Sequence, residues 1–159
     1  MNQTDDLERR ISKLEDESEI RRVFYNYCFR QDQRNVEAFL SLLTDDVRLA
    51  FPGWDLEVNG KENLKKYFIE QVFATHEYHM HKVTNFNVQI DGEKAYGEAY
   101  LSLHSSYQGE PQEAYIRYML QFRKEKGMWL LNEINCEVIL WNGSLSPQDQ
   151  SVYERFTVS

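Results

Sequence analysis

Apolar residues recur at helical spacing over the first third of the chain. Leu7, Ile11 and Leu14 lie four and three residues apart among charged residues, which predicts a short amphipathic helix over residues 5–18. A second helix is predicted over residues 19–31, where apolar positions from Ile20 to Cys28 follow a 3.6-residue period. A third is predicted over residues 35–43, because Asn35 is a favourable N-cap and a polar stop signal follows.

The pattern changes to alternation and aromatic content near residue 79. Long strands are predicted over residues 79–90, 94–107, 113–124 and 128–141, after a short strand at 47–51 and a helix at 61–72. The dipeptides Asp91-Gly92, Gln108-Gly109 and Lys126-Gly127 between the long strands are typical of hairpins. Helices followed by a strand meander predict an α+β fold, in which a curved antiparallel sheet carries the helices on one face.

Strict alternation raises one difficulty in the strand at 79–90. If His81 points inward, Phe86, Val88 and Ile90 point outward, where apolar side chains are not expected. Either a bulge near Thr84-Asn85 redirects the strand, or a partner subunit covers the outer face together with Leu101 and Leu103. The second alternative predicts a homo-oligomer, a trimer or a dimer.

Composition limits the classes of partner and the number of domains. The 159 residues, 42% of them hydrophobic, predict one domain over residues 1–142 and a polar tail over 143–159, which we expect to lie on a neighbouring subunit. A net charge of −8 disfavours binding to nucleic acid or to an anionic membrane. The first twenty residues lack an apolar stretch suited to export or to spanning a bilayer, so the expected location is the cytoplasm.

The clearest candidate for chemistry is the pair Asp32 and His81, at the end of a predicted helix and the start of a predicted strand. A carboxylate that orients an imidazole makes a base that works near neutral pH. An aspartate at a helix C-terminus is locally unfavourable because the helix dipole is negative there, so its position calls for another explanation. The alternative is that the two side chains make no contact.

Several segments together resemble the SnoaL-like branch of the nuclear transport factor 2-like superfamily. They are residues 27–32, residues 39–46, the sequence His-Lys-Val-Thr-Asn at 81–85 and the turn at 91–95. The resemblance spans roughly residues 5–142 and is strongest to the group that includes scytalone dehydratase, lindane dehydrochlorinase and bile-acid 7α-dehydratase. It implies a conical α+β barrel that opens at one end onto an apolar cavity.

The resemblance also implies roles for single residues. Asp32 and His81 match the dyad, Tyr27 matches a catalytic tyrosine of bile-acid dehydratase, and His104 matches a second pocket histidine of scytalone dehydratase. Two departures limit the comparison. Gln31 and Phe51 replace the tyrosines that hold a water in scytalone dehydratase, and residues 135–140 contain no counterpart of the late arginine of the other two enzymes.

Further candidates for substrate binding are Phe51, Tyr100, Met119 and Arg117. Arg117 would meet an anionic substrate atom if its strand face points into the cone, and would otherwise be solvated. On an apolar helix face, Tyr27 is more often a core residue than an acid, whereas the strand face of His104 fits solvent exposure as well as a wet pocket. The aromatic residues, 14% of the chain, either line a cavity for a flat ligand or fill the core.

His76, His79 and His81 raise the question of a metal, but no cysteine or carboxylate pattern completes a ligand set. We therefore expect neither metal nor cofactor. The combined prediction is a cofactor-independent lyase of the dehydratase type that acts on a small, largely apolar hydroxy-carbonyl, steroid-like or polyketide-like molecule. The alternatives are an isomerase or polyketide cyclase using the same pocket, or a ligand-binding domain without catalysis.

Overall fold

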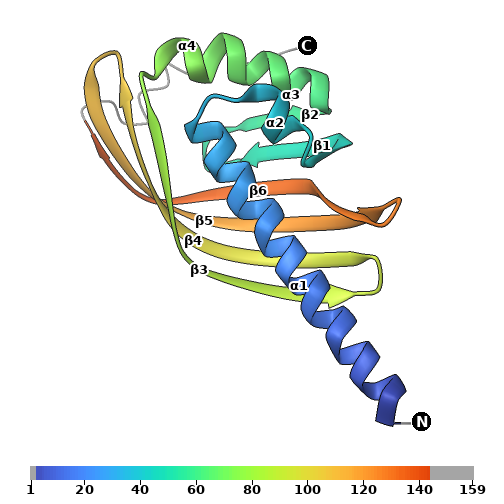
Figure 1. Ribbon diagram of the computed structural model, residues 1–159. Coiled ribbons are helices and arrows are strands. Elements are labelled where there is room, and N and C mark those ends of the chain that lie inside the picture. The colour runs from blue at the N-terminus through green and yellow to red at the C-terminus, as the bar shows by residue number, and fades with distance from the viewer. Residues whose placement is uncertain (1–2, 144–159) are drawn as a thin grey trace.

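The computed structural model describes residues 3–143, in which helices pack against a curved sheet (Figure 1). The helices are α1 (Gln3–Asp32), α2 (Val36–Leu40), α3 (Lys61–Tyr67) and α4 (Phe73–Thr75), with a 3-10 turn at Pro52–Trp54 and a π-helical turn at Phe68–Val72. The strands are β1 (Leu43–Phe51), β2 (Leu56–Asn59), β3 (His79–Asp91), β4 (Lys94–Tyr107), β5 (Glu110–Glu125) and β6 (Met128–Gly143). The predicted tail lies almost wholly outside the described residues.

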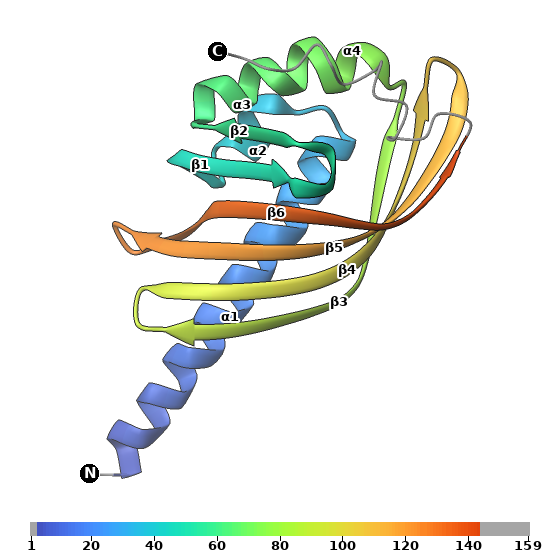
Figure 2. The ribbon, with the colours of Figure 1, turned by 180° about the vertical axis from the view of Figure 1, so that it is seen from behind.

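The six strands form a single sheet in the order β2-β1-β6-β5-β4-β3. The predicted antiparallel meander is confirmed for β3 to β6, whereas β1 joins the far side of β6 in a parallel pairing. The sheet is curved but not closed, because β2 and β3 remain at its two edges, so the expected conical barrel is an open one. Seen from behind, one end of the four long strands bends towards α4 (Figure 2).

The first two predicted helices are one continuous helix, α1, so the boundary expected near residue 18 was wrong. The segment between them contains neither glycine nor proline, and its acidic residues are compatible with a helix interior. Asp16 in that segment accepts hydrogen bonds from Lys124 Nζ and Trp129 Nε1, both at 2.7 Å, which attaches the middle of α1 to the β5–β6 hairpin. The N-terminal part, with Leu7, Ile11 and Leu14 exposed, projects beyond the sheet (Figure 1).

The other predicted boundaries differ by a few residues. Asn35 does cap the third helix, accepting a hydrogen bond from the amide of Ala38, but this helix ends at Leu40 and Leu43 already belongs to β1. The helix predicted to begin at Lys61 does so, and helical turns continue to Thr75. In the 3–143 range no helix is long and apolar enough to cross a membrane.

A bulge in β3 resolves the conflict in its alternation. Val83 pairs with Leu101 and Asn85 pairs with Tyr100, so Thr84 is an extra residue without a cross-strand partner. His81 therefore faces inward before the bulge, and Phe86 faces inward after it.

Five residues expected on the outer face are consequently misassigned. Phe86 and Leu101 are buried, and the remaining three pack at least partly against the core: Val88, Ile90 and Leu103. The apolar patch that motivated a homo-oligomer does not exist in that form.

Candidate active site

Asp32 and His81 contact each other through two hydrogen bonds. The ring Nδ1 of His81 lies 2.5 Å from Asp32 Oδ1, and the backbone amide of His81 donates to Asp32 Oδ2 at 3.0 Å. A carboxylate accepts, so Nδ1 carries the proton and Nε2 of the neutral ring is unprotonated. The His81 side chain is only 4% exposed and that of Asp32 is 20% exposed. The pair has the geometry of an oriented base.

The position of Asp32 follows from the end of α1. Asp32 is the last residue of the helix, where the backbone dipole disfavours a negative charge. The amide of His81 supplies a donor that offsets this effect, and the packing of α1 on β3 brings the two residues together across 49 positions of sequence. The aspartate thus acts as a connection between helix and strand as well as a partner for the ring.

His81 lines a cavity of about 130 Å³ between the helices and the inner face of the sheet. Its walls are largely aromatic and aliphatic, with a few amide, hydroxyl and imidazole groups. Residues that line it are Tyr27, Gln31, Leu49, Phe51, Trp54, Tyr67, Phe68, Gln71, Val72, Thr75, His76, His79, His81, Leu103, Ser105, Tyr107, Ile116, Tyr118 and Trp141. Of the predicted site residues, the cavity therefore brings together His81, Tyr27 and Phe51, with Asp32 bound to His81.

Tyr27 lies one turn before the dyad aspartate on the buried face of α1. Burial raises the pKa of its phenol well above the usual value. The hydroxyl group therefore stays protonated across the physiological range and is a neutral hydrogen-bond donor at the cavity wall.

Two further histidines stand beside His81 in the wall. The ring of His79 lies 4.9 Å from that of His76 and 6.5 Å from that of His81, measured between centroids. Burial, followed by the positive charge that the neighbouring histidines and Arg34 can carry, lowers the pKa of His79 to about 3, and burial also lowers the pKa of His76. His79 and His76 are therefore neutral at physiological pH.

Arg34 is held beside this row of rings by backbone carbonyl groups. Its guanidinium donates to the carbonyl oxygens of Phe73 and His76 at the end of the helical segment that precedes β3. The guanidinium of Arg34 thus holds the segment that contains His76 in place. Within residues 3–143, no cluster of three or more histidine, cysteine, aspartate or glutamate side chains is arranged to hold a metal ion.

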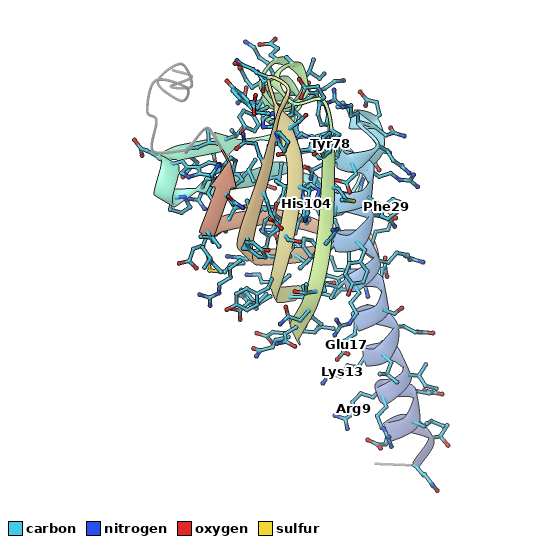
Figure 3. The ribbon with its side chains drawn as sticks, turned by 90° about the vertical axis from the view of Figure 1, so that its left-hand side faces the viewer. Arg9, Lys13, Glu17, Phe29, Tyr78 and His104 are labelled. Atoms are coloured by element: carbon cyan, nitrogen blue, oxygen red, sulfur yellow. The ribbon has the colours of Figure 1, made fainter. Side chains whose placement is uncertain are left out.

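Four predicted site residues lie on the opposite, outer face of the sheet, so their assignment to the pocket is corrected. The side chain of His104 lies on β4 (Figure 3). It alternates with Leu103 and Ser105, which line the cavity, and contacts Glu113 and Lys82 instead. Arg117 pairs with Glu98 and Glu137, and the two others on this face are Tyr100 and Met119. The reason is the two-residue period of a strand, which turns neighbours such as Ile116 and Arg117 to opposite faces.

The cavity contains several residues that the sequence did not identify as candidates for the site. Phe51, which was selected, stacks on Trp54 with ring centroids 4.8 Å apart, and Trp54 meets Trp141 edge to face. Gln31 is a polar residue at helical spacing from Ile20, Phe24 and Tyr27, on the buried face of α1. That spacing was a signal, since a polar residue on an apolar helix face needs a partner.

Comparison with known proteins agrees with this architecture. The model of the SnoaL-like domain family matches residues 12–135. No curated protein sequence is similar enough to this chain to give a match.

Solved structures with the same fold include enzymes of small-molecule metabolism. A type 2 hexachlorocyclohexane dehydrochlorinase (LinA) is 14% identical, with a TM-score of 0.79 over 86% of this chain and 93% of the other. A Novosphingobium aromaticivorans protein provisionally named scytalone dehydratase is 16% identical, with a TM-score of 0.78 over 86% and 93%. A nuclear transport factor 2-like protein with a cystatin-like fold from the same organism is 18% identical, with a TM-score of 0.76 over 96% and 97%. The expected SnoaL-like family is confirmed by the family model, and these solved structures share its fold.

Proposed function

This chain belongs to the SnoaL-like family, and we propose that it is a cofactor-independent lyase of the dehydratase type. Its substrate is a small, largely apolar molecule with a hydroxyl group β to a carbonyl. The observation that carries the proposal is the hydrogen bond between Asp32 Oδ1 and His81 Nδ1, at the wall of an otherwise mostly apolar cavity. A polar, oriented base in such a wall has no evident role in packing.

In the proposed reaction, His81 Nε2 takes the proton from the carbon next to the substrate carbonyl. The electron pair of that C–H bond forms the new C=C bond as the bond to the β-hydroxyl group breaks. Asp32 stabilises the imidazolium that results and keeps the ring in place. The leaving hydroxyl group takes a proton and departs as water, so no oxidant, reductant or cofactor is needed.

Tyr27 is the proposed hydrogen-bond donor to the leaving group or to the carbonyl oxygen. It lines the same cavity as His81 and remains protonated because burial raises the pKa of its phenol. The proton that the leaving group takes comes from the imidazolium of His81, which returns the base to its neutral state. His104, the other acid considered from the sequence, has no part because it lies on the outer face of the sheet.

Proton abstraction can be tested with 3-hydroxycyclohexanone, a one-ring β-hydroxy ketone that loses water to give cyclohex-2-enone. Proton NMR in D₂O follows both the replacement of α-hydrogen by deuterium and the appearance of the enone. We expect the wild-type protein to accelerate exchange at the α-carbon. The His81→Ala variant should lose roughly 10²- to 10⁴-fold of that acceleration, as is usual when a general base is removed.

The exchange measurement also separates the related activities. An isomerase or a polyketide cyclase shares the first step, so it would give exchange without enone. A folded His81→Ala protein that exchanges as fast as wild type contradicts a catalytic dyad and favours a ligand-binding domain. Asp91→Asn, at the exposed end of β3, is the matched control and should exchange like wild type.

A further inference from the structure

Two buried hydrogen-bond donors in the cavity wall have no partner among residues 3–143. They are the amide nitrogen Nε2 of Gln31 and the indole nitrogen Nε1 of Trp141. The Gln31 side chain lies close enough to the Tyr27 hydroxyl to lower the pKa of that phenol, but its Nε2 meets no acceptor of the described residues in hydrogen-bond geometry. The Gln31 side chain belongs to a residue that is only 6% exposed. Trp129 provides the contrast, because its indole nitrogen donates to Asp16 at 2.7 Å.

Such donors are costly when they are left without an acceptor. Burying an N–H group without a hydrogen bond destabilises the folded protein, and most buried polar groups in native proteins are paired. An indole N–H can only donate, as can an amide Nε2. A molecule that satisfies both must therefore present acceptor atoms, and in a mostly apolar cavity the natural acceptor is a carbonyl or hydroxyl oxygen.

The wall also indicates the charge of the molecule. No lysine, arginine, aspartate or glutamate is among the cavity-lining residues in the described part of the chain. His76 and His79 are neutral at physiological pH, and the guanidinium of Arg34 is engaged by backbone carbonyl oxygens. An anionic group would therefore lose its hydration here without direct contact with a cationic side chain of the wall.

The size and shape of the cavity fit a single ring. Its volume of about 130 Å³ is near that of an engineered protein cavity of about 150 Å³ that accommodates benzene. The parallel rings of Phe51 and Trp54, at an interplanar angle of 3°, and the edge-on ring of Trp141 give the wall flat surfaces.

We propose that Gln31 and Trp141 form an acceptor-binding subsite that selects an uncharged, ring-sized ketone by donating hydrogen bonds to its oxygen atoms. The inference rests on the proposed function, for which it names the substrate class. A donor on the carbonyl oxygen also stabilises the negative charge that develops there as His81 removes the neighbouring proton. Gln31 immediately precedes Asp32 on α1, so this donor and the aspartate of the dyad belong to the same turn of helix.

Three probes of equal shape test the subsite. Acetophenone has the carbonyl, α-methylstyrene replaces C=O by C=CH₂, and benzoate replaces the ketone by an anion. Isothermal titration calorimetry with the wild-type protein should give roughly ten-fold tighter binding of acetophenone than of α-methylstyrene, the effect of one or two net hydrogen bonds. Benzoate should bind more weakly than acetophenone. Equal or tighter binding of α-methylstyrene, or tightest binding of benzoate, would overturn the proposal.

Variants assign the preference to the two donors. Gln31→Leu and Trp141→Phe should each weaken acetophenone binding roughly five- to ten-fold and leave α-methylstyrene binding unchanged or tighter. Gln33→Leu removes an exposed amide two residues away, and Trp129→Phe removes an indole outside the cavity, so both should keep the preference. An unchanged preference in folded Gln31→Leu and Trp141→Phe proteins would contradict the assignment.

A spectroscopic measurement covers the case in which a variant does not fold. In ¹⁵N-labelled wild-type protein, the indole N–H signal of Trp141 should move downfield with acetophenone and not with α-methylstyrene, while that of Trp129 stays in place. A Trp141 signal that responds equally to both probes overturns the subsite.

The His81→Ala variant distinguishes the role of the dyad in catalysis from the role of the two donors in binding. The His81→Ala variant should lose proton exchange but retain the preference for acetophenone. Loss of that preference in folded His81→Ala protein would mean that the imidazole, rather than the two donors, binds the oxygen.

Discussion

Both carboxylate oxygens of Asp32 are bonded to His81, Oδ1 to the ring nitrogen Nδ1 and Oδ2 to the backbone amide. The ring is thereby fixed to its own backbone through a residue of another element. This arrangement leaves the ring with little freedom to rotate and holds the tautomer in which Nε2 is unprotonated.

Asp32→Asn should reduce α-proton exchange roughly 10- to 10²-fold, less than His81→Ala does. The amide oxygen can still accept from one of the two donors of His81, but the amide NH₂ group cannot accept from the other, and the charge that stabilises imidazolium is lost. The rates of both variants in the NMR exchange assay provide the comparison. An Asp32→Asn protein slower than His81→Ala would show that the aspartate itself acts on the substrate.

The stability of the protein should fall as the pH is lowered from 6.5. The pKa of His79 is about 3 in the folded state, below the 6.5 of an unfolded histidine, so the unfolded chain binds more protons between these values. The contribution of neutral His79 to the free energy of unfolding is therefore fully present above pH 6.5 and decreases towards pH 3. His76, whose pKa is also lowered, acts in the same direction. We expect a loss of roughly 2 kcal/mol from this source between pH 6.5 and pH 4.5.

Urea denaturation across this pH range, compared between wild type and His79→Gln, measures the effect. The glutamine variant should lose much of the slope between pH 6.5 and 4.5, since it has no titratable group at this position. His104→Gln, on the outer face, is the matched control and should retain the slope. Identical slopes in all three proteins would mean that His79 is not neutral in the folded state.

Gly97→Ala should destabilise the protein by about 1–3 kcal/mol, the usual cost of overpacking a core. A Cβ atom at Gly97 would lie 2.5 Å from Cε2 and 2.9 Å from Cζ of Phe86, and 3.1 Å from Cε2 of Phe122. Phe86 is confined by Phe24 at a ring-centroid distance of 5.0 Å, so its ring has little room to move. The midpoint of urea denaturation gives the difference.

Two further variants of the same protein provide a control and a rescue for this substitution. Gly53→Ala meets no atom within 4 Å and should change the free energy of unfolding by less than about 0.5 kcal/mol. Phe86→Leu combined with Gly97→Ala should cost less than the sum of the two single changes, because the ring that clashes is gone. Strict additivity would place the cause outside the Gly97–Phe86 contact.

Self-association stays a prediction, but the surface that supports it has changed. The outer face carries exposed apolar side chains at Tyr96, Tyr100 and Tyr115, with Leu140 opposite Tyr115 on the next strand. We expect copies of the chain to associate through this face, and Tyr115→Glu to shift the molecules towards monomer in sedimentation equilibrium. Leu14→Glu, on the projecting part of α1, is the control and should leave the association unchanged. Dissociation by Leu14→Glu but not by Tyr115→Glu would show that the copies associate through α1 instead.

Local patterns were sufficient for most of the elements, although they placed a helix boundary near residue 18 and did not indicate β2. The spacing of Ile20, Val23 and Phe24 indicates which side of α1 is buried, and glycine-containing turns separate the long strands, because both signals depend on residues close in sequence. Asp32 and His81 were singled out by their chemistry, and the family resemblance supplied the expectation that they meet in the folded protein.

Only the tertiary structure decided which strand faces enclose the cavity. One extra residue at Thr84 reverses the faces of the rest of β3, and sequence alternation could suggest such a bulge but not choose between it and a covering subunit. His104 and Arg117 looked as suitable for a pocket as Tyr27, and only the packing of the helices on the other face of the sheet showed that their strand face points outward. Two of the polar groups that the cavity does contain, Gln31 and Trp141, lie far apart in the sequence. Their common position depends on packing between distant segments, which the residues around each of them do not encode.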